Sequence, residues 1–354
     1  MKLPIASGLL LLGSLVSTEV HASRARELIL GTGDGGVALN GGSFLFDHGY
    51  NIFYNPAYIN DFNHWGTIEK SNAPGGTAQG GIFDSLFLIS YGVFLNRGSA
   101  IVTVPGIAGG TTLPYAVAPV RPFEFFVGGD FGFKWGLGLS YAGARASSGN
   151  SSDLSVHAGA VIGDYEPFFT IKPSGNEPNR EHYFYRAGLR YRWGEWVPYF
   201  VAVTAGDRST DPNALSALKE ITYGFGFTRS TRVVEGVKMN YGLSYYKIAD
   251  SGGPAQGERK ILPLDLSFEG ALNEWATLLG GVSYRLLDRL DGLSSADNTT
   301  GRIGLRLAND KVSLEWALGK NLPDNGSEQP DSLDTQSIDL TNGFFTAANV
   351  TFRW

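Results

Sequence analysis

Most of the chain follows a two-residue period in which large apolar side chains alternate with small or polar ones. Between Trp135 and Tyr141 the odd positions are Trp, Leu, Leu and Tyr, whereas the even positions are Gly, Gly and Ser. The same division recurs over 221–229, 238–246 and 302–307. Because side chains alternate between the two faces of a strand, each segment predicts a strand with one apolar face and one small or polar face.

Composition narrows the class of chain that carries these strands. The 354 residues include 48 glycines, and only 18% are charged, whereas average usage is roughly 7% glycine and about 25% charged residues. A helical membrane protein would need several apolar runs of about 20 residues, and the only long run is at the N-terminus. The net charge of -6, without a Lys/Arg cluster, argues against nucleic acid as a partner. The absence of cysteine excludes a disulfide scaffold.

The spacing of the segments suggests how they are connected. Short turns alternate with longer polar links, among them 144–152 and 321–342. This alternation is typical of a meander in an outer membrane, whereas a secreted sandwich or propeller would need a dry core on the Gly/Ser/Arg face. We therefore predict an all-β, transmembrane, antiparallel outer-membrane β-barrel. The predicted strands lie near 64–71, 80–94, 98–104, 121–128, 132–144, 153–163, 165–173, 182–192, 195–206, 219–229, 236–248, 259–270, 275–287, 299–308, 311–320 and 344–354.

The N-terminus has the three-part pattern of an export signal. Lys2 precedes an apolar stretch over 3–16, polar residues follow, and Val20 and Ala22 supply the −3 and −1 positions of a cleavage site. An N-terminal core helix is the alternative, and the glycines and proline inside the stretch disfavour it. We predict cleavage after Ala22 and export to the outer membrane.

The C-terminus carries a second export-related pattern. Val350, Phe352 and Trp354 share one face of the last predicted strand, and the final residue is aromatic. This resembles the C-terminal strand signal of bacterial outer-membrane barrels. The resemblance implies that the barrel-assembly machinery reads Phe352 and Trp354, with outer-membrane lipid and lipopolysaccharide as the surroundings of the finished barrel.

The segment before the first strand resembles the opening of the FadL-like long-chain fatty-acid transporter superfamily and its PorV-type relatives. The similarity rests on residues 26–31 and 36–39, which are rich in Gly and apolar residues, and on the Asn55-Pro56-Ala57 motif. It implies that residues 23–63 form a hatch inside the barrel. The superfamily is expected to have 14 strands and the pattern gives 16, so we predict 14 to 16. The expected division is 1–22 signal peptide, 23–63 hatch-like segment and 64–354 barrel.

Aromatic side chains are frequent in the hatch-like segment. We expect these side chains either to line a hydrophobic path for a solute or to anchor the segment to the barrel wall. With the Asn55-Pro56-Ala57 motif, the residues concerned are Phe44, Phe46, Tyr50, Phe53, Tyr54 and Tyr58.

Charged residues fall on the inward positions of the predicted strands. They either set the selectivity of an open channel or pair into a network that fills a closed one. Arg302 and Arg306, beside Glu315 on one neighbouring strand and Arg285 on the other, are the favoured constriction. The full set is Lys134, Arg186, Arg190, Lys238, Asp265, Glu269, Arg285, Arg302, Arg306, Lys311, Glu315 and Arg353.

Signals for catalysis and for a cofactor or metal are weak. The G-x-G-x-x-G pattern over 31–36 lacks the βαβ context of a phosphate cradle. Ser155 and His157 share an inner face, yet their spacing along the strand is roughly 7 Å, too long for a nucleophile and its base. The histidines have no metal-ligand spacing. The acidic loop 321–342 has oxygen ligands suited to Ca²⁺ but matches no defined loop, so a solvated loop is favoured. We expect neither an enzyme nor a cofactor or metal site.

Two functions remain open from the sequence. The first is a passive channel for small or hydrophobic solutes. The second is a non-transport barrel that acts as a scaffold, adhesin or secretion accessory protein. The glycine-rich inner face favours the channel because it leaves room in the lumen.

Overall fold

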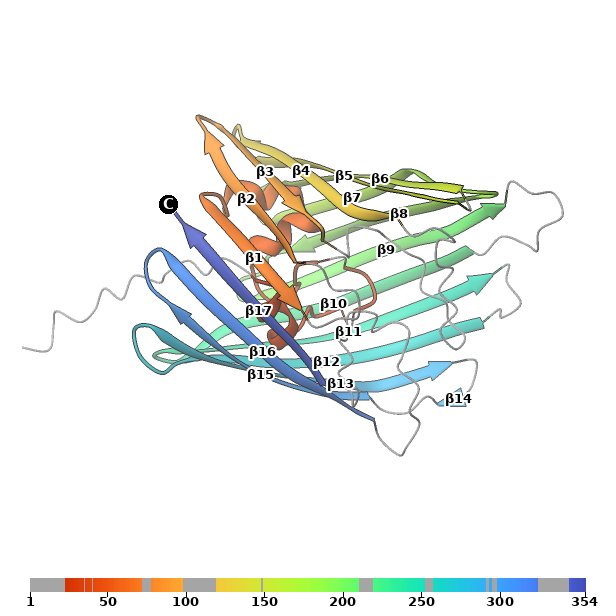
Figure 1. Cartoon of the computed structure of the whole chain (residues 1–354). Coiled ribbons are helices and arrows are strands. Elements are labelled where there is room, and N and C mark those ends of the chain that lie inside the picture. Colours follow the sequence, from red (N-terminus) through yellow and green to blue (C-terminus); the bar gives the residue numbers. More distant parts are fainter. Residues whose placement is uncertain are drawn as a thin grey trace, which may run out of the picture.

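The computed structural model describes residues 23–34, 36–39, 41–71, 78–97, 119–147, 149–209, 219–251, 257–290, 293–294, 298–323 and 344–354. Within them, sixteen strands form one closed antiparallel barrel (Figure 1). A two-residue piece, β14 (Leu293–Ser294), pairs with the end of β13. The barrel strands are β1 (Trp65–Ser71), β2 (Gln79–Leu86), β3 (Ile89–Leu95), β4 (Val120–Asp130), β5 (Lys134–Ala146), β6 (Gly149–Val161), β7 (Tyr165–Glu177), β8 (Arg180–Tyr191), β9 (Trp196–Ser209), β10 (Lys219–Val234), β11 (Val237–Ser251), β12 (Gly257–Ala271), β13 (Ala276–Leu290), β15 (Asn298–Ala308), β16 (Val312–Pro323) and β17 (Phe344–Arg353).

Pairing of the first strand with the last closes the barrel. β1 lies antiparallel to β17, with Trp65 opposite Arg353 and Ser71 opposite Ala347. Closure removes sheet edges and pairs backbone N–H and C=O groups between strands, which a bilayer requires of a spanning structure. The predicted fold class is confirmed, and the strand number is at the upper end of the predicted range.

Large apolar side chains face outward and small or polar side chains face inward, as the two-residue period of the sequence predicts. Leu137 and Phe225 are 47% and 53% exposed on the outer face, whereas Glu124, Thr170 and Thr228 are buried on the inner face. Because the outer face is apolar and the inner face polar or small, the wall suits lipid outside and polar contents inside. Within the described residues, no helix is both long and apolar enough to cross a membrane.

Two predicted features of the wall are wrong. The strand expected over 80–94 is a hairpin, in which β2 and β3 are joined by a turn at Phe87 and Leu88. Phe87 has a φ of +56°, a turn conformation that strand periodicity does not reveal. The connection expected to be long over 144–152 is short, because β5 runs to Ala146 and β6 starts at Gly149. The strand predicted at 98–104 lies outside the described residues.

An N-terminal segment lies inside the barrel, as predicted. It contains α1 (Arg24–Leu30) and two 3₁₀ helices, η1 (Gly49–Phe53) and η2 (Pro56–Asn60). α1 packs against β12, β13 and β15 to β17, and η2 packs against β3 to β6 on the other side of the lumen. Figure 1 shows these coils, in red and orange, enclosed by the strands. We call residues 23–63 the hatch; the predicted signal peptide, 1–22, lies outside the described residues.

Candidate functional site: the hatch and its sockets in the barrel wall

α1 is held in a charged socket. Ser23 is the N-cap, and its hydroxyl oxygen accepts a hydrogen bond from the backbone N–H of Arg26 at 3.0 Å. The same hydroxyl donates to Glu315 on β16. Arg26 donates to both carboxylate oxygens of Glu269 on β12, at 2.6 and 2.8 Å. Since Arg26 and Glu269 are both buried, the pair fixes α1 in position and orientation.

Inward-facing glycines leave space for the hatch. A Cβ atom at Gly281 of β13 or Gly304 of β15 would collide with Ile29 of α1. By contrast, a Cβ at Gly301, three residues earlier on β15 and therefore on the outer face of the strand, would meet nothing within 4 Å. The glycines that face the hatch therefore permit close approach of another segment.

The Asn55-Pro56-Ala57 motif begins η2 and seats it on the wall. The Asn55 side chain caps the helix by accepting from the Ala57 N–H at 3.2 Å, and it donates to the Ala160 carbonyl of β6 at 3.3 Å. Pro56 occupies the first helical position, where its missing N–H costs nothing. Its backbone lies where a Cβ at Gly136 of β5 would be. The motif thus contributes a cap, a helix start and a wall contact.

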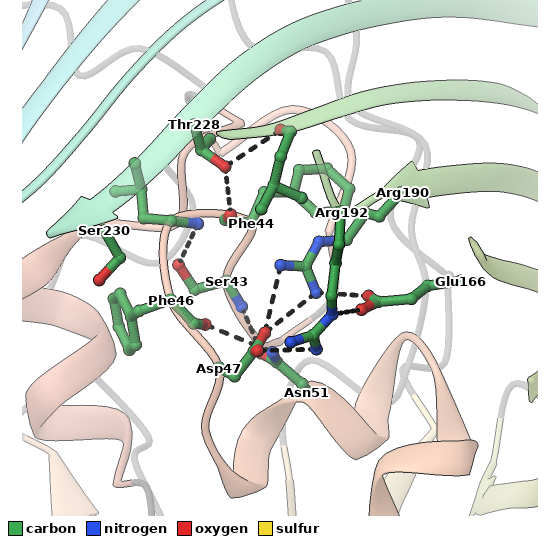
Figure 2. Close-up of polar contacts among 12 residues, drawn as sticks. Ser43, Phe44, Phe46, Asp47, Asn51, Glu166, Arg190, Arg192, Thr228 and Ser230 are labelled. Atoms are coloured by element: carbon green, nitrogen blue, oxygen red, sulfur yellow. Dashed lines mark hydrogen bonds and ion pairs between the residues drawn. The ribbon is translucent and has the colours of Figure 1, made fainter. Parts of the chain in front are cut away.

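A second charged socket lies at Asp47, which we call the Asp47 clamp (Figure 2). Arg190 of β8 donates to the Asp47 carboxylate at 3.2 Å, and Arg192, just after β8, donates at 2.8 Å. Glu166 of β7 accepts from both arginines. The Tyr58 hydroxyl lies 2.7 Å from Glu166 and 3.1 Å from Asp47. Two cations and two anions therefore compensate one another where the hatch meets the wall.

The clamp sets the charge state of Asp47. Removal from bulk water raises the pKa of Asp47, but the guanidinium groups of Arg190 and Arg192 outweigh this effect and hold the pKa at about 2. Asp47 is consequently ionised at neutral pH. The ion pair joins the hatch to the wall over the ordinary pH range.

The glycine-rich loop of the hatch is organised around Asp34. Its carboxylate accepts from the backbone N–H groups of Gly36, Ala38 and Leu39, at 3.0, 2.9 and 2.6 Å. These are N–H groups of the kind that a phosphate would use in a cradle. The G-x-G-x-x-G pattern here serves a turn that is closed by its own carboxylate.

The wall also binds backbone carbonyl groups of the hatch, in this loop and just after it. Tyr199 of β9 donates to the Gly33 carbonyl at 2.6 Å, and Arg186 of β8 donates to that of Ala38 at 3.1 Å. Thr228 of β10 donates to the carbonyl of Phe44 at 2.7 Å (Figure 2). These bonds satisfy polar groups that would otherwise be buried without partners.

Aromatic side chains of the hatch pack against aromatic side chains of the wall. The Phe44 ring lies 4.0 Å from Tyr199, between ring centroids, and the Phe53 ring lies 5.2 Å from Phe94 of β3. The six aromatic residues that the sequence singled out in the hatch are all buried. They are Phe44, Phe46, Tyr50, Phe53, Tyr54 and Tyr58.

The residues of the favoured constriction do not all lie together in the barrel. Arg306 lies directly opposite Glu315 in the strand register, and the Arg302 guanidinium lies beside Gly31 of the hatch together with Asp265. Arg285, however, pairs with Asp288 at 3.0 Å. It lies eight residues from Thr277, which faces Arg306, so about 26 Å of strand separates them. Arg285 therefore does not join Arg306 and Glu315.

Three lysines that the sequence predicts to face the lumen have different surroundings in the structure. Lys238 of β11 lies opposite Glu269 in the register. Lys134 pairs with Asp61 of the hatch. Lys311 is exposed in the turn before β16, so its predicted position in the lumen is wrong.

Several residues of the two sockets were not predicted. Arg26, Asp47, Glu166 and Arg192 have no spacing that marks them, because they meet only once the hatch is folded into the barrel. A carboxylate in an otherwise apolar and glycine-rich segment, as Asp47 is, was the available signal.

The residues considered for catalysis or metal binding have other partners. The Ser155 hydroxyl donates to Asp153, and the His157 ring lies within hydrogen-bond distance of Ser140 and Thr170. In the part of the chain that the structure describes, no group of three or more His, Cys, Asp or Glu side chains is placed to hold a metal ion. Most of the acidic loop 321–342 lies outside that part.

Comparison with solved structures supports the fold. A bacterial polysaccharide outer-membrane secretin matches with a TM-score of 0.53 and 8% identity, over 82% of this chain and 97% of that one. OmpT of Vibrio cholerae matches at 0.44 and 7% identity, over 82% and 95%. The toluene transporter TodX of P. putida matches at 0.37 and 11%, over 85% and 92%. The first likeness shows a shared outer-membrane barrel fold, and the other two are too weak to add to it. No family model and no curated protein matches the sequence.

Proposed function

We propose that this chain is a channel of the bacterial outer membrane for the passive passage of small or hydrophobic solutes, with the hatch as a plug that moves. The observation that carries the proposal is how the hatch is attached. None of the described strand pairings includes a hatch residue. The contacts are side-chain sockets, bonds to loop carbonyls and glycine-lined surfaces, and these can be released without opening the wall.

The chemistry of the sockets favours a plug that can be displaced. Opening Arg26–Glu269 or the Asp47 clamp would return buried charges to water, and the regained hydration offsets much of the lost attraction. The wall residues behind the hatch, such as Thr170 and Ser267, are polar. They would be hydrated once the hatch moves, which is what an aqueous passage needs.

The resemblance to the FadL-like superfamily supports the same proposal. In this chain the segment with the Asn55-Pro56-Ala57 motif lies in the lumen, as that resemblance implies. The sixteen strands differ from the fourteen expected of the superfamily. We further propose that Ala22 ends a cleaved signal peptide and that the assembly machinery reads Phe352 and Trp354. The proposal includes no enzymatic activity.

A second function, a permanently plugged barrel that acts as a scaffold or secretion accessory, has one specific observation in its favour. Six of the hatch aromatics are buried to 2% exposure or less, so the hatch resembles a packed core. The two proposals differ in whether the hatch ever leaves its sockets.

Solute uptake into proteoliposomes tests the proposal. The solutes are a set of small molecules graded from polar to apolar, and the proteins are the wild type, Asp47→Asn and, as a matched control, Glu195→Gln in an exposed turn. We expect wild-type uptake above that of protein-free vesicles and faster uptake with Asp47→Asn. If wild type and Asp47→Asn both take up every solute at the rate of protein-free vesicles, the result favours the scaffold.

A further inference from the structure

The first described residue of the hatch is also one of the most deeply buried. Ser23 has 0% exposure, caps α1 and touches Glu315 on the barrel wall. The sequence independently predicts that the chain is cut between Ala22 and Ser23. The predicted new N-terminus is therefore a buried residue that contacts the barrel wall.

Two carboxylates face this end of the hatch. Glu315 of β16 is 2% exposed, and Glu69 of β1 is 3% exposed. Glu69 accepts from the side chains of Gln79 at 2.9 Å and Asn349 at 3.2 Å, and also from the backbone N–H of Arg24. Both acidic side chains thus converge on the first residues of α1.

One oxygen of this pair has no partner among the described residues. Glu315 uses Oε2 for the Ser23 hydroxyl, whereas its buried Oε1 makes no hydrogen bond. Arg306 lies opposite Glu315 in the register, yet its buried Nε and Nη1 also make none. A buried carboxylate oxygen without a donor costs free energy, so this position calls for a further donor.

We propose that export processing frees the α-amino group of Ser23 and that Glu315, assisted by Glu69, binds it as an ammonium that anchors the hatch. A signal peptidase hydrolyses the Ala22–Ser23 peptide bond with one water before the barrel folds. Ala22 leaves with the new carboxylate, and the new amine of Ser23 takes up a proton. The structure assigns a binding site to that ammonium.

The geometry of serine places the ammonium within reach. The nitrogen and Oγ of one serine are three covalent bonds apart, so they lie within about 4 Å of each other. Because Oγ of Ser23 already touches Glu315, the nitrogen lies within about 6 Å of that carboxylate, a range over which an opposite charge stabilises the ionised form of a neighbouring group. The three donors of an ammonium suit both the free Oε1 and a second acceptor such as Glu69.

Because of this ammonium anchor, firm binding of the hatch in the barrel depends on cleavage of the signal peptide. An uncut chain presents at Ser23 a neutral amide, which lacks the charge and the three donors of an ammonium. The uncut hatch would be seated less firmly. This inference concerns processing and seating, and it holds whether or not the barrel transports a solute.

Intact mass and N-terminal sequencing of the exported full chain provide the first test. We expect the mature protein to begin at Ser23. Any other first residue would overturn the proposal.

A cycle of refolded chains tests the ammonium itself. Four chains are compared. Two begin at Ser23 and two carry a Gly-Ser extension before Ser23, and each start is combined with either Glu315 or Glu315→Gln. Glu195→Gln serves as the control. The readout is the rate at which protease cuts the hatch in the folded barrel. We expect the extension to raise this rate about tenfold with Glu315, since an ion pair buried from water is worth more than an exposed one. With Glu315→Gln, the extension should raise the rate of hatch proteolysis less than about twofold. An equal effect in both backgrounds would overturn the proposal.

A chemical readout keeps the proposal testable if Glu315→Gln does not fold. The wild-type chain beginning at Ser23 is treated with an amine-selective reagent at pH 7, and the N-terminal peptide is quantified by mass. We expect labelling at least about tenfold slower than in the unfolded chain, because the bound amine stays protonated and buried. Labelling at the unfolded rate would overturn the proposal.

Discussion

The barrel wall and the hatch are held by different forces. Wall strands are joined by long runs of backbone pairing, such as the fifteen-residue strands β11 and β12, and these bonds depend little on which side chains are present. The hatch has three short helices and is held by single side chains, chiefly Arg26, Asp47 and Asn55. One region is thus secured by a repeated pattern and the other by individual contacts.

The difference shows where each region is vulnerable. Replacing one wall side chain leaves the backbone ladder intact, whereas replacing one socket residue removes a contact that nothing else duplicates. Function that needs motion is expected in the less redundant region. The predictions below separate the two regions, beginning with the largest expected effect.

Crowding the glycine-lined surface under α1 should unseat the hatch. Gly304→Leu puts a side chain where Ile29 lies, and overpacking of this kind costs about 1–3 kcal/mol or more. Gly301→Leu on the same strand is the matched control, since its Cβ meets nothing within 4 Å. Native-state proteolysis should cut the hatch faster in Gly304→Leu only, with the barrel still resistant to heat in detergent. Equal protection of the hatch in both variants would refute this account of the glycines.

Breaking the Asp47 clamp should have the next largest effect. Asp47→Ala leaves Arg190 facing Glu166 without its second anion, and we expect a loss of about 2 kcal/mol in hatch seating, less than for a fully buried pair because Asp47 is 33% exposed. The measurement is again proteolysis of the hatch, compared with the thermal unfolding of the barrel. A variant that lowers barrel stability as much as hatch seating would show that the two regions are not separable.

The contribution of Asp47 should depend on pH in a defined direction. Its pKa is about 2 in the clamp, against 3.8 for the ordinary group, so the folded pKa is lowered. Stability from the clamp is then full above about pH 4 and disappears as the pH falls toward 2. The difference in hatch proteolysis between wild type and Asp47→Asn, measured with an acid-stable protease, should be constant from pH 7 to about 4 and shrink below that. A difference as large at pH 2 as at pH 7 contradicts the assignment.

An exposed ion pair of the wall should matter least. Glu195 is 56% exposed and pairs with Arg229 near a short turn. Glu195→Gln should change the thermal stability of the barrel by no more than about 0.5 kcal/mol, because solvent screens exposed charges. Hatch proteolysis should not change. A larger effect would mean that wall side chains contribute more to stability than backbone pairing allows.

The sequence predicted the wall far better than the sockets. Period two over residues such as Leu137 and Phe225 is a local signal, so strand positions and the outward face followed directly. The Phe87 turn was missed because a left-handed residue leaves no trace in an apolar run. Arg285 was grouped with Arg306 because the prediction counted neighbouring strands without their register. The Asp47 clamp joins residues more than one hundred positions apart, and only folding of the hatch brings them together.

The account rests on a hatch that is separable from a self-sufficient barrel, and single-channel conductance in a planar bilayer tests this most directly. The proteins are the full mature chain, a variant lacking residues 23–58, and the same deletion with Arg302→Gln and Arg306→Gln. We predict low or brief conductance with the hatch, large stable conductance without it, and a shift of ion selectivity away from anions when the two arginines are neutralised. Silence in the deletion variant, from a barrel shown to be folded, would contradict the account.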